Sequence, residues 1–225
     1  KFKKILMLVS ALFFFSDFTH AETKSTGGEQ MNTALILIEY QNEWLNLKSK
    51  LNALIKDREQ FETSVKNSKL ALAEARKRKM PVIHVTMTLE PSYKLFGQGE
   101  YGLRAAIPKA KTWLGKQAEI HSDFKPLNGE YVIKERSGAS AFAGTTLDSY
   151  LRNNNISTIY ITGYALHVCV ESTLREAHDL GYKTNVIYDA STAFSKEQQS
   201  YFLNDIIHHY GHAITTKDFV QQGQL

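Results

Sequence analysis

Short apolar runs alternate with amphipathic helical patterns along most of the chain, and this alternation constrains the fold more than any other feature. Residues 34–38 form a continuous apolar run, which is typical of a strand buried on both faces of a sheet. Apolar residues from Phe61 to Ala75 then recur at helical spacing and predict a helix with one buried face. Strands that alternate with helices predict a three-layer, doubly wound (Rossmann-like) α/β domain with a parallel sheet.

The same patterns place the individual elements. The expected strands cover residues 34–38, 81–85, 131–133, 157–162, 183–188 and 213–216. The first helix is expected to end in the basic residues 76–79, and the side chain of Thr146 is expected to cap the second. Gly181 is placed to end the third helix, and residues 197–210 predict the fourth.

The N-terminal segment predicts export. Residues 1–4 are mostly basic, residues 5–15 are apolar, and Thr19-His20-Ala21 offers a small-residue cleavage site. The apolar run is shorter than the roughly 20 residues that a membrane-spanning helix needs. We therefore expect a signal peptide at 1–21, a flexible lead-in at 22–32, a folded domain at 33–225, and no stable membrane anchor after cleavage. A buried helix, an uncleaved anchor and a start at Met31 are the alternatives.

Composition excludes several classes of protein. An apolar content of 43% and a charged content of 22% are those of a globular domain and exclude disordered, collagenous and disulfide-scaffold chains. The basic cluster at 76–79 fits the end of a helix, so no nucleic-acid partner is expected. The single cysteine, Cys169, cannot form an internal disulfide. It is an inert buried thiol, an intermolecular partner or a reactive site.

Three polar side chains follow expected strands. Glu39 follows the first strand, Lys134 the third, and Cys169 the fourth after a short turn. Ligands of doubly wound sheets bind at the carboxyl ends of the strands where the strand order reverses, so these groups are expected to converge there. A helix N-terminus and a neighbouring Lys134 would favour the thiolate of Cys169, and Glu39 could accept its proton.

The chain resembles the isochorismatase-like cysteine hydrolases. The resemblance covers about residues 33–216 and rests on ALILIEYQN (34–42), VIK (132–134), SAFAGT (140–145), GYALHVCV (163–170) and YDA (188–190). It implies a six-stranded parallel sheet, an isochorismatase-like hydrolase domain at 33–225, and a Cys–Lys–Asp triad. Cys169 and Lys134 match the triad, and Glu39 stands where the family usually has Asp.

The resemblance also implies how the turn before Cys169 works. It places a cis peptide bond at Tyr164–Ala165 and makes the backbone N–H groups of Ala165 and Cys169 the oxyanion donors. Residues 91–123 are expected to cover the pocket, as their aromatic side chains suit that task. Four residues are expected to line the substrate pocket: Tyr164, Phe142, Gln41 and His167. Phe142 could equally be a core residue, and His167 could equally face solvent.

No metal or other cofactor is expected. Nicotinamidases of the family carry an Asp and paired histidines after the second strand, whereas this chain reads VTMTLE at 85–90. His208 and His209 are adjacent on a helix and cannot face one ion together. The expected partner is a small-molecule substrate, and the resemblance implies a homo-oligomer.

These features predict an exported, periplasmic or secreted, cysteine-dependent hydrolase. It would cleave a C–N bond of a small amide or ureido substrate through a thioester acyl-enzyme. Vinyl-ether hydrolysis of the isochorismatase type, a non-catalytic ligand-binding protein that tolerates Glu39, and a thiol redox protein are the alternatives.

Overall fold

The computed structural model describes residues 32–222. The expected signal peptide and nearly all of the expected lead-in lie outside the described residues. Within residues 32–222, no helix is both long enough and apolar enough to cross a membrane.

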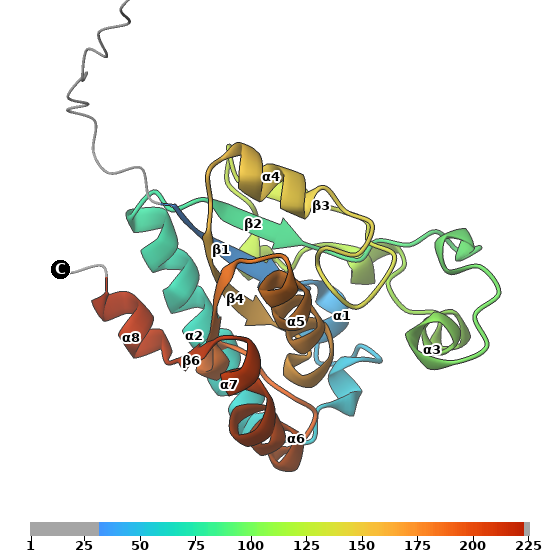
Figure 1. The fold of residues 1–225 in the computed structure, drawn as a ribbon. Coiled ribbons are helices and arrows are strands. Elements are labelled where there is room, and N and C mark those ends of the chain that lie inside the picture. Colours follow the sequence, from blue (N-terminus) through green and yellow to red (C-terminus); the bar gives the residue numbers. More distant parts are fainter. Residues whose placement is uncertain (1–31, 223–225) are drawn as a thin grey trace, which may run out of the picture. The chain divides into compact units, whose positions relative to one another are not determined.

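Six parallel strands form one sheet in the order β3-β2-β1-β4-β5-β6 (Figure 1). The strands are β1 (Thr33–Ile38), β2 (Val82–Val85), β3 (Tyr131–Ile133), β4 (Thr158–Gly163), β5 (Lys183–Ile187) and β6 (His212–Ile214). With helices on both faces of this sheet, the predicted three-layer α/β fold is confirmed.

Alternating side chains of β1 define the two cores. Ala34, Ile36 and Ile38 pack under one helical layer, formed by α4 (Leu147–Asn153), α5 (Glu171–Asp179) and α7 (Ile207–Tyr210), while α6 (Lys196–Tyr201) buries no residue. Leu35 and Leu37 pack under the other, formed by α2 (Arg58–Lys77) and α8 (Thr216–Gln221). Because successive side chains of a strand point to opposite faces, a strand buried on both sides reads as the continuous apolar run seen at 34–38.

Some predicted element ends are corrected. Thr146 makes no capping bond; its hydroxyl lies 2.8 Å from that of Tyr131, and Thr145 Oγ1 accepts from the Leu147 N–H instead. The predicted helix at 197–210 is interrupted by a π-helical turn, Phe202–Ile206. The last strand ends at Ile214, because Thr215 forms a capping box that starts α8.

Three short helices and several turns were not predicted, and α8 (Thr216–Gln221) is one of these helices. The others are α1 (Asn42–Leu45), α3 (Gly102–Ala110), the 3₁₀ turns Asn52–Leu54, Lys94–Phe96, Gly115–Ala118, Ser122–Phe124 and Tyr188–Ala190, and the π-helical turn Leu166–Val170. Ile107 is the only buried residue of α3, so this helix lacks the apolar stripe from which helices are predicted.

The strand order reverses between β1 and β4, which pair along their whole lengths. Gly163 ends β4 with a positive φ, and any Cβ there would overlap the carbonyl oxygen of Ile38. Only glycine therefore permits this close approach. The crevice at the carboxyl ends of these two strands is where ligands of such sheets bind.

Candidate active site

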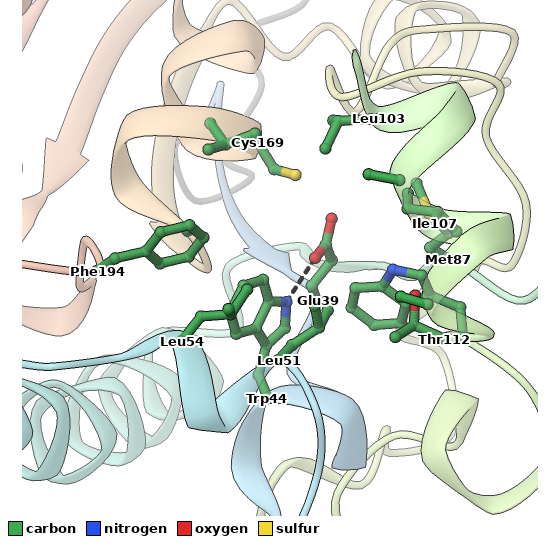
Figure 2. A pocket seen from close by; sticks show the side chains of 15 residues that line it. Glu39, Trp44, Leu51, Leu54, Met87, Leu103, Ile107, Thr112, Cys169 and Phe194 are labelled. Carbon is green, nitrogen blue, oxygen red and sulfur yellow. Dashed lines mark hydrogen bonds between the residues drawn. The ribbon is translucent and has the colours of Figure 1, made fainter. Parts of the chain in front are cut away.

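Glu39 lies at the carboxyl end of β1 with its side chain almost fully buried. Its backbone has a positive φ of 60°, and its N–H donates to the carbonyl of Val85 at 2.8 Å. Trp44 of α1 donates its indole N–H to Glu39 Oε2 at 2.6 Å (Figure 2). A buried carboxylate needs such partners, because burying it without them is costly.

Arg136 supplies the opposite charge. Its side chain is fully buried, and Nη2 forms an ion pair with Glu39 Oε1. The same Nη2 lies 3.4 Å from the sulfur of Cys169. Burial lowers the pKa of the Arg136 guanidinium from its ordinary value. One nitrogen atom of Arg136 therefore joins the carboxylate and the thiol.

Cys169 belongs to the π-helical turn that follows β4, and its side chain is buried. Burial raises the pKa of the Cys169 thiol, and the charge of Arg136 and the backbone N–H of Ala165 offset this only in part. The sequence predicted a lowered pKa for Cys169, because a helix N-terminus and a nearby cation would favour the thiolate. Loss of solvent outweighs both and favours the neutral thiol.

Lys134 is not brought to this site. It is exposed, and no hydrogen bond or ion pair links its side chain to Glu39 or Cys169 within residues 32–222. Three charged residues follow β3: Lys134, Glu135 and Arg136. The sequence predicted the first of them, Lys134, as the catalytic cation. The loop leaves the first two exposed and turns Arg136 inward. The run of charges signalled a site residue, but only the loop conformation decides which one is buried.

The peptide bond between Tyr164 and Ala165 is cis, at the position where the resemblance implied one. Ala165 lines the pocket. Its N–H donates no hydrogen bond to a backbone carbonyl or side-chain oxygen among the described residues. The assignment of Ala165 and Cys169 as oxyanion donors stays a prediction.

A cavity of about 230 Å³ opens beside Cys169 and Glu39 (Figure 2). Residues after β1, before α2, after β2, in and after α3, and after β4 and β5 line it: Glu39, Trp44, Leu51, Leu54, Met87, Leu103, Ala106, Ile107, Ala110, Thr112, Trp113, Ala165, Val168, Cys169 and Phe194. Figure 2 shows the sulfur of Cys169 and the carboxylate of Glu39 directed into the same space, with Leu103 and Ile107 on its far side. Part of the segment expected as a cover, residues 103–113, thus forms one wall.

The four residues expected to line the pocket do not lie on its wall. Gln41 holds the loop after β2, with Nε2 donating to the Met87 carbonyl and Oε1 accepting the Met87 N–H, both at 2.9 Å. Tyr164 points into the core, where its hydroxyl meets Ser64, and burial raises its pKa.

The other two also have structural surroundings. Phe142 stacks on Tyr182 in the core, with ring centroids 5.8 Å apart. His167 is half-buried with its ring edge-on to Phe194, and burial lowers its pKa. Phe194, the partner of His167 in this ring contact, lines the cavity, whereas His167 does not. Gln41, Tyr164 and His167 thus contact residues that line the cavity, namely Met87, Trp44 and Phe194, whereas Phe142 belongs to the core.

Comparisons with known proteins agree with this architecture. The family model for the isochorismatase domain matches residues 33–218. The isochorismatase family protein YwoC of Bacillus subtilis is 39% identical over 105 residues, which are 47% of this chain and 55% of YwoC. The chain thus matches about half the length of that relative.

Two further proteins match over a longer range. The ureidoacrylate amidohydrolase RutB of Variovorax paradoxus is 28% identical over 204 residues, covering 84% of this chain and 81% of RutB. The solved structure of an isochorismatase family protein from Burkholderia thailandensis has a TM-score of 0.72 at 26% identity, covering 86% of this chain and 96% of that one. Because the family model spans most of the chain, the protein belongs to the isochorismatase family.

Proposed function

We propose that the protein is a hydrolase that uses Cys169 to cleave the C–N bond of a small amide or ureido substrate. The observation that carries the proposal is the buried chain of contacts from Glu39 through Arg136 to Cys169, with two of the three facing one cavity. The similarity to RutB, named an ureidoacrylate amidohydrolase, supports the type of reaction.

In the first step, the sulfur of Cys169 attacks the substrate carbonyl carbon while Glu39 takes the thiol proton. Because burial raises the pKa of Cys169, removal of the proton during the attack is favoured over ionisation before it. Arg136 keeps its charge throughout and stabilises the developing thiolate as well as the carboxylate. In this account Arg136 has the role that the sequence assigned to Lys134.

The tetrahedral intermediate then collapses to products. The N–H groups of Ala165 and Cys169 would hold its oxyanion. The C–N bond breaks, the nitrogen leaves with the proton held by Glu39, and a thioester on Cys169 remains. Water, with Glu39 as its base, attacks the thioester, and the sulfur leaves and recovers its proton. The sum is amide plus water giving carboxylic acid plus ammonia or amine.

Ammonia release from a panel of primary amides, ureido acids and biuret tests this function. We expect turnover of at least one compound by the wild-type protein, and a loss of at least about 1,000-fold in kcat/KM for Cys169→Ala. Lys134→Ala, which alters an exposed side chain outside the cavity, is the matched control and should retain activity. Full activity in Cys169→Ala would overturn the proposal.

A ligand-binding protein without catalysis is the second candidate. It is favoured by the complete engagement of Glu39, whose two oxygen atoms already meet Trp44 and Arg136. Glu39→Asp separates the two functions, since it retracts the carboxylate by one methylene toward the length usual in the family. If the protein is an enzyme, Glu39→Asp should change kcat/KM by about 10-fold or more, because misplacing a catalytic group by about 1 Å can lower the rate about 100-fold. A protein that only binds would show no turnover in either form.

A further inference from the structure

We propose that the substrate carries an uncharged, apolar acyl group, such as a branched alkyl chain or a single aromatic ring, and no carboxylate. This ligand class rests on the proposed function in that it names what Cys169 would act on. It would set the protein apart from hydrolases whose substrates are ureido acids.

The chemistry of the cavity wall carries the inference. Apart from Glu39, Thr112 and Cys169, every residue that lines the cavity is apolar. Thr112 is buried, and its hydroxyl has no hydrogen-bond partner among the described residues. The pocket thus offers a ligand apolar surface and the hydroxyl of Thr112 besides the reacting groups.

The charges around the cavity disfavour an anionic ligand. Among residues 32–222, no lysine, arginine or histidine lines it. Arg136, the cation in contact with two lining residues, pairs with Glu39 through Nη2 and does not itself reach the wall. A substrate carboxylate would enter an apolar cavity with no cation and with Glu39 nearby. Burying a charge without a partner is strongly unfavourable, so a neutral ligand is preferred.

The size of the cavity and the character of its entrance also favour an apolar ligand. A cavity of about 230 Å³ exceeds the roughly 150 Å³ of an apolar cavity known to hold benzene, so one ring or a branched alkyl chain fits. Trp44 packs between Trp113 and Phe194, with ring centroids 6.2 and 6.0 Å from its own. Leu54 and Leu103, both lining residues, are 46% and 41% exposed, so the entrance is apolar as well.

The test compares two primary amides that differ only in one group. In 4-methylpentanamide an isopropyl group stands where succinamate has a carboxylate. The Cys169→Ala variant binds without turning over, and both tryptophans of the chain line the cavity, so tryptophan fluorescence reports binding directly. We expect the Kd of 4-methylpentanamide to be at least about 30-fold lower than that of succinamate. Equal or tighter binding of succinamate, or no saturable signal with either amide, would overturn the ligand class.

A charge added at the entrance sharpens the test. Leu103→Arg in the Cys169→Ala background should strengthen succinamate binding by about 10-fold or more, because it supplies the missing cation. Leu47→Arg adds the same charge at an exposed residue that does not line the cavity and should change nothing. A gain of the same size in both variants would overturn the inference.

Wild-type turnover separates the two proposals. Selective binding of 4-methylpentanamide by Cys169→Ala, with no hydrolysis of any panel member by the wild-type protein, would overturn the hydrolase and uphold the ligand class. Hydrolysis of succinamate in preference to 4-methylpentanamide would uphold the hydrolase and overturn the ligand class.

Discussion

At the scale of single residues, the site depends on a charge pair that is withdrawn from solvent. Glu39 and Arg136 are each almost fully buried, so each is the main compensation for the other's charge. Removing one partner of such a pair leaves an uncompensated buried charge, whereas replacing both with neutral groups of similar size costs far less. Arginine suits this position because it cannot lose its charge and has more than one N–H to offer.

Arg136→Gln should therefore lower the free energy of unfolding by about 3–5 kcal/mol and reduce kcat/KM by at least about 100-fold. Urea denaturation and ammonia release measure the two effects. Lys134→Gln should shift the free energy of unfolding by no more than about 0.5 kcal/mol, since it changes an exposed residue. The double variant Glu39→Gln/Arg136→Gln should recover most of the lost stability but none of the activity. Equal effects at positions 134 and 136 would contradict this assignment of the cation.

The reactivity of Cys169 should follow its raised pKa. A raised pKa favours the protonated thiol, so the midpoint of ionisation lies above the ordinary cysteine value of 9.0. The rate of alkylation by iodoacetamide, followed by mass, should still be rising at pH 9. Arg136→Gln should move the profile to higher pH, because it removes the charge that favours the thiolate. A plateau below pH 8 would show that the thiol is activated in the resting protein.

At the scale of elements, a polar network ties α2 to two strands. Arg76 of α2 donates to Glu130 at 2.7 Å, and the ring of His84 on β2 lies 2.7 Å from Glu130, which directly precedes β3. Burial opposes ionisation of Glu130, but hydrogen bonds from Arg76, the Leu127 N–H and His84 outweigh it and hold the pKa of Glu130 at about 2. This carboxylate therefore stabilises the fold above its ordinary pKa.

Glu130→Gln should lower the free energy of unfolding at pH 7 by about 1–2 kcal/mol, a figure reduced for the partial exposure of Arg76. A lowered pKa contributes stability that is complete above the unfolded value of 4.5 and is lost as the pH falls toward 2. Urea denaturation from pH 7 to pH 3 should thus show the wild-type and variant curves converging below pH 4.5. A difference that stays constant with pH would contradict the role of the charge.

The sequence predicted elements where burial follows a regular period. The run 34–38 and the stripe from Phe61 to Ala75 are buried as their periods require. Prediction from the sequence failed where tertiary contacts decide the conformation. In α3 only Ile107 is buried, and the helix at 197–210 contains a π-helical turn that no period announces.

At the scale of the whole molecule, the topology brings distant segments together at one edge of the sheet. Glu39 and Cys169 could be predicted because each follows a strand at the position where the strand order reverses. The segment that forms one wall, residues 103–113, was also expected near the pocket. Arg136 and the remaining walls could not be predicted, since which charge turns inward and which apolar side chains face a cavity depend on loop packing. Trp44 and Phe194 lie in a helix of four residues and in a loop, where sequence carries little positional information.

Export is proposed from the N-terminal sequence alone, in residues that the structure does not describe. If the chain is exported, the protein recovered from the periplasm or medium of an expressing bacterium should begin at Glu22, as determined by N-terminal sequencing. Protein that stays in the cytoplasm with its first residues intact would contradict export. The fold and the proposed chemistry do not depend on this result, because every site residue lies within residues 39–194.

The proposed mechanism requires that Cys169 form a covalent acyl-enzyme. The most direct test mixes the protein with the amide of the panel that it hydrolyses fastest, quenches the reaction in acid within milliseconds, and measures the intact mass. We predict a mass increase equal to the acyl group, located on the peptide that contains Cys169 and absent from Cys169→Ala. Turnover that persists in Cys169→Ala, with no acyl adduct on the wild-type protein, would contradict the account.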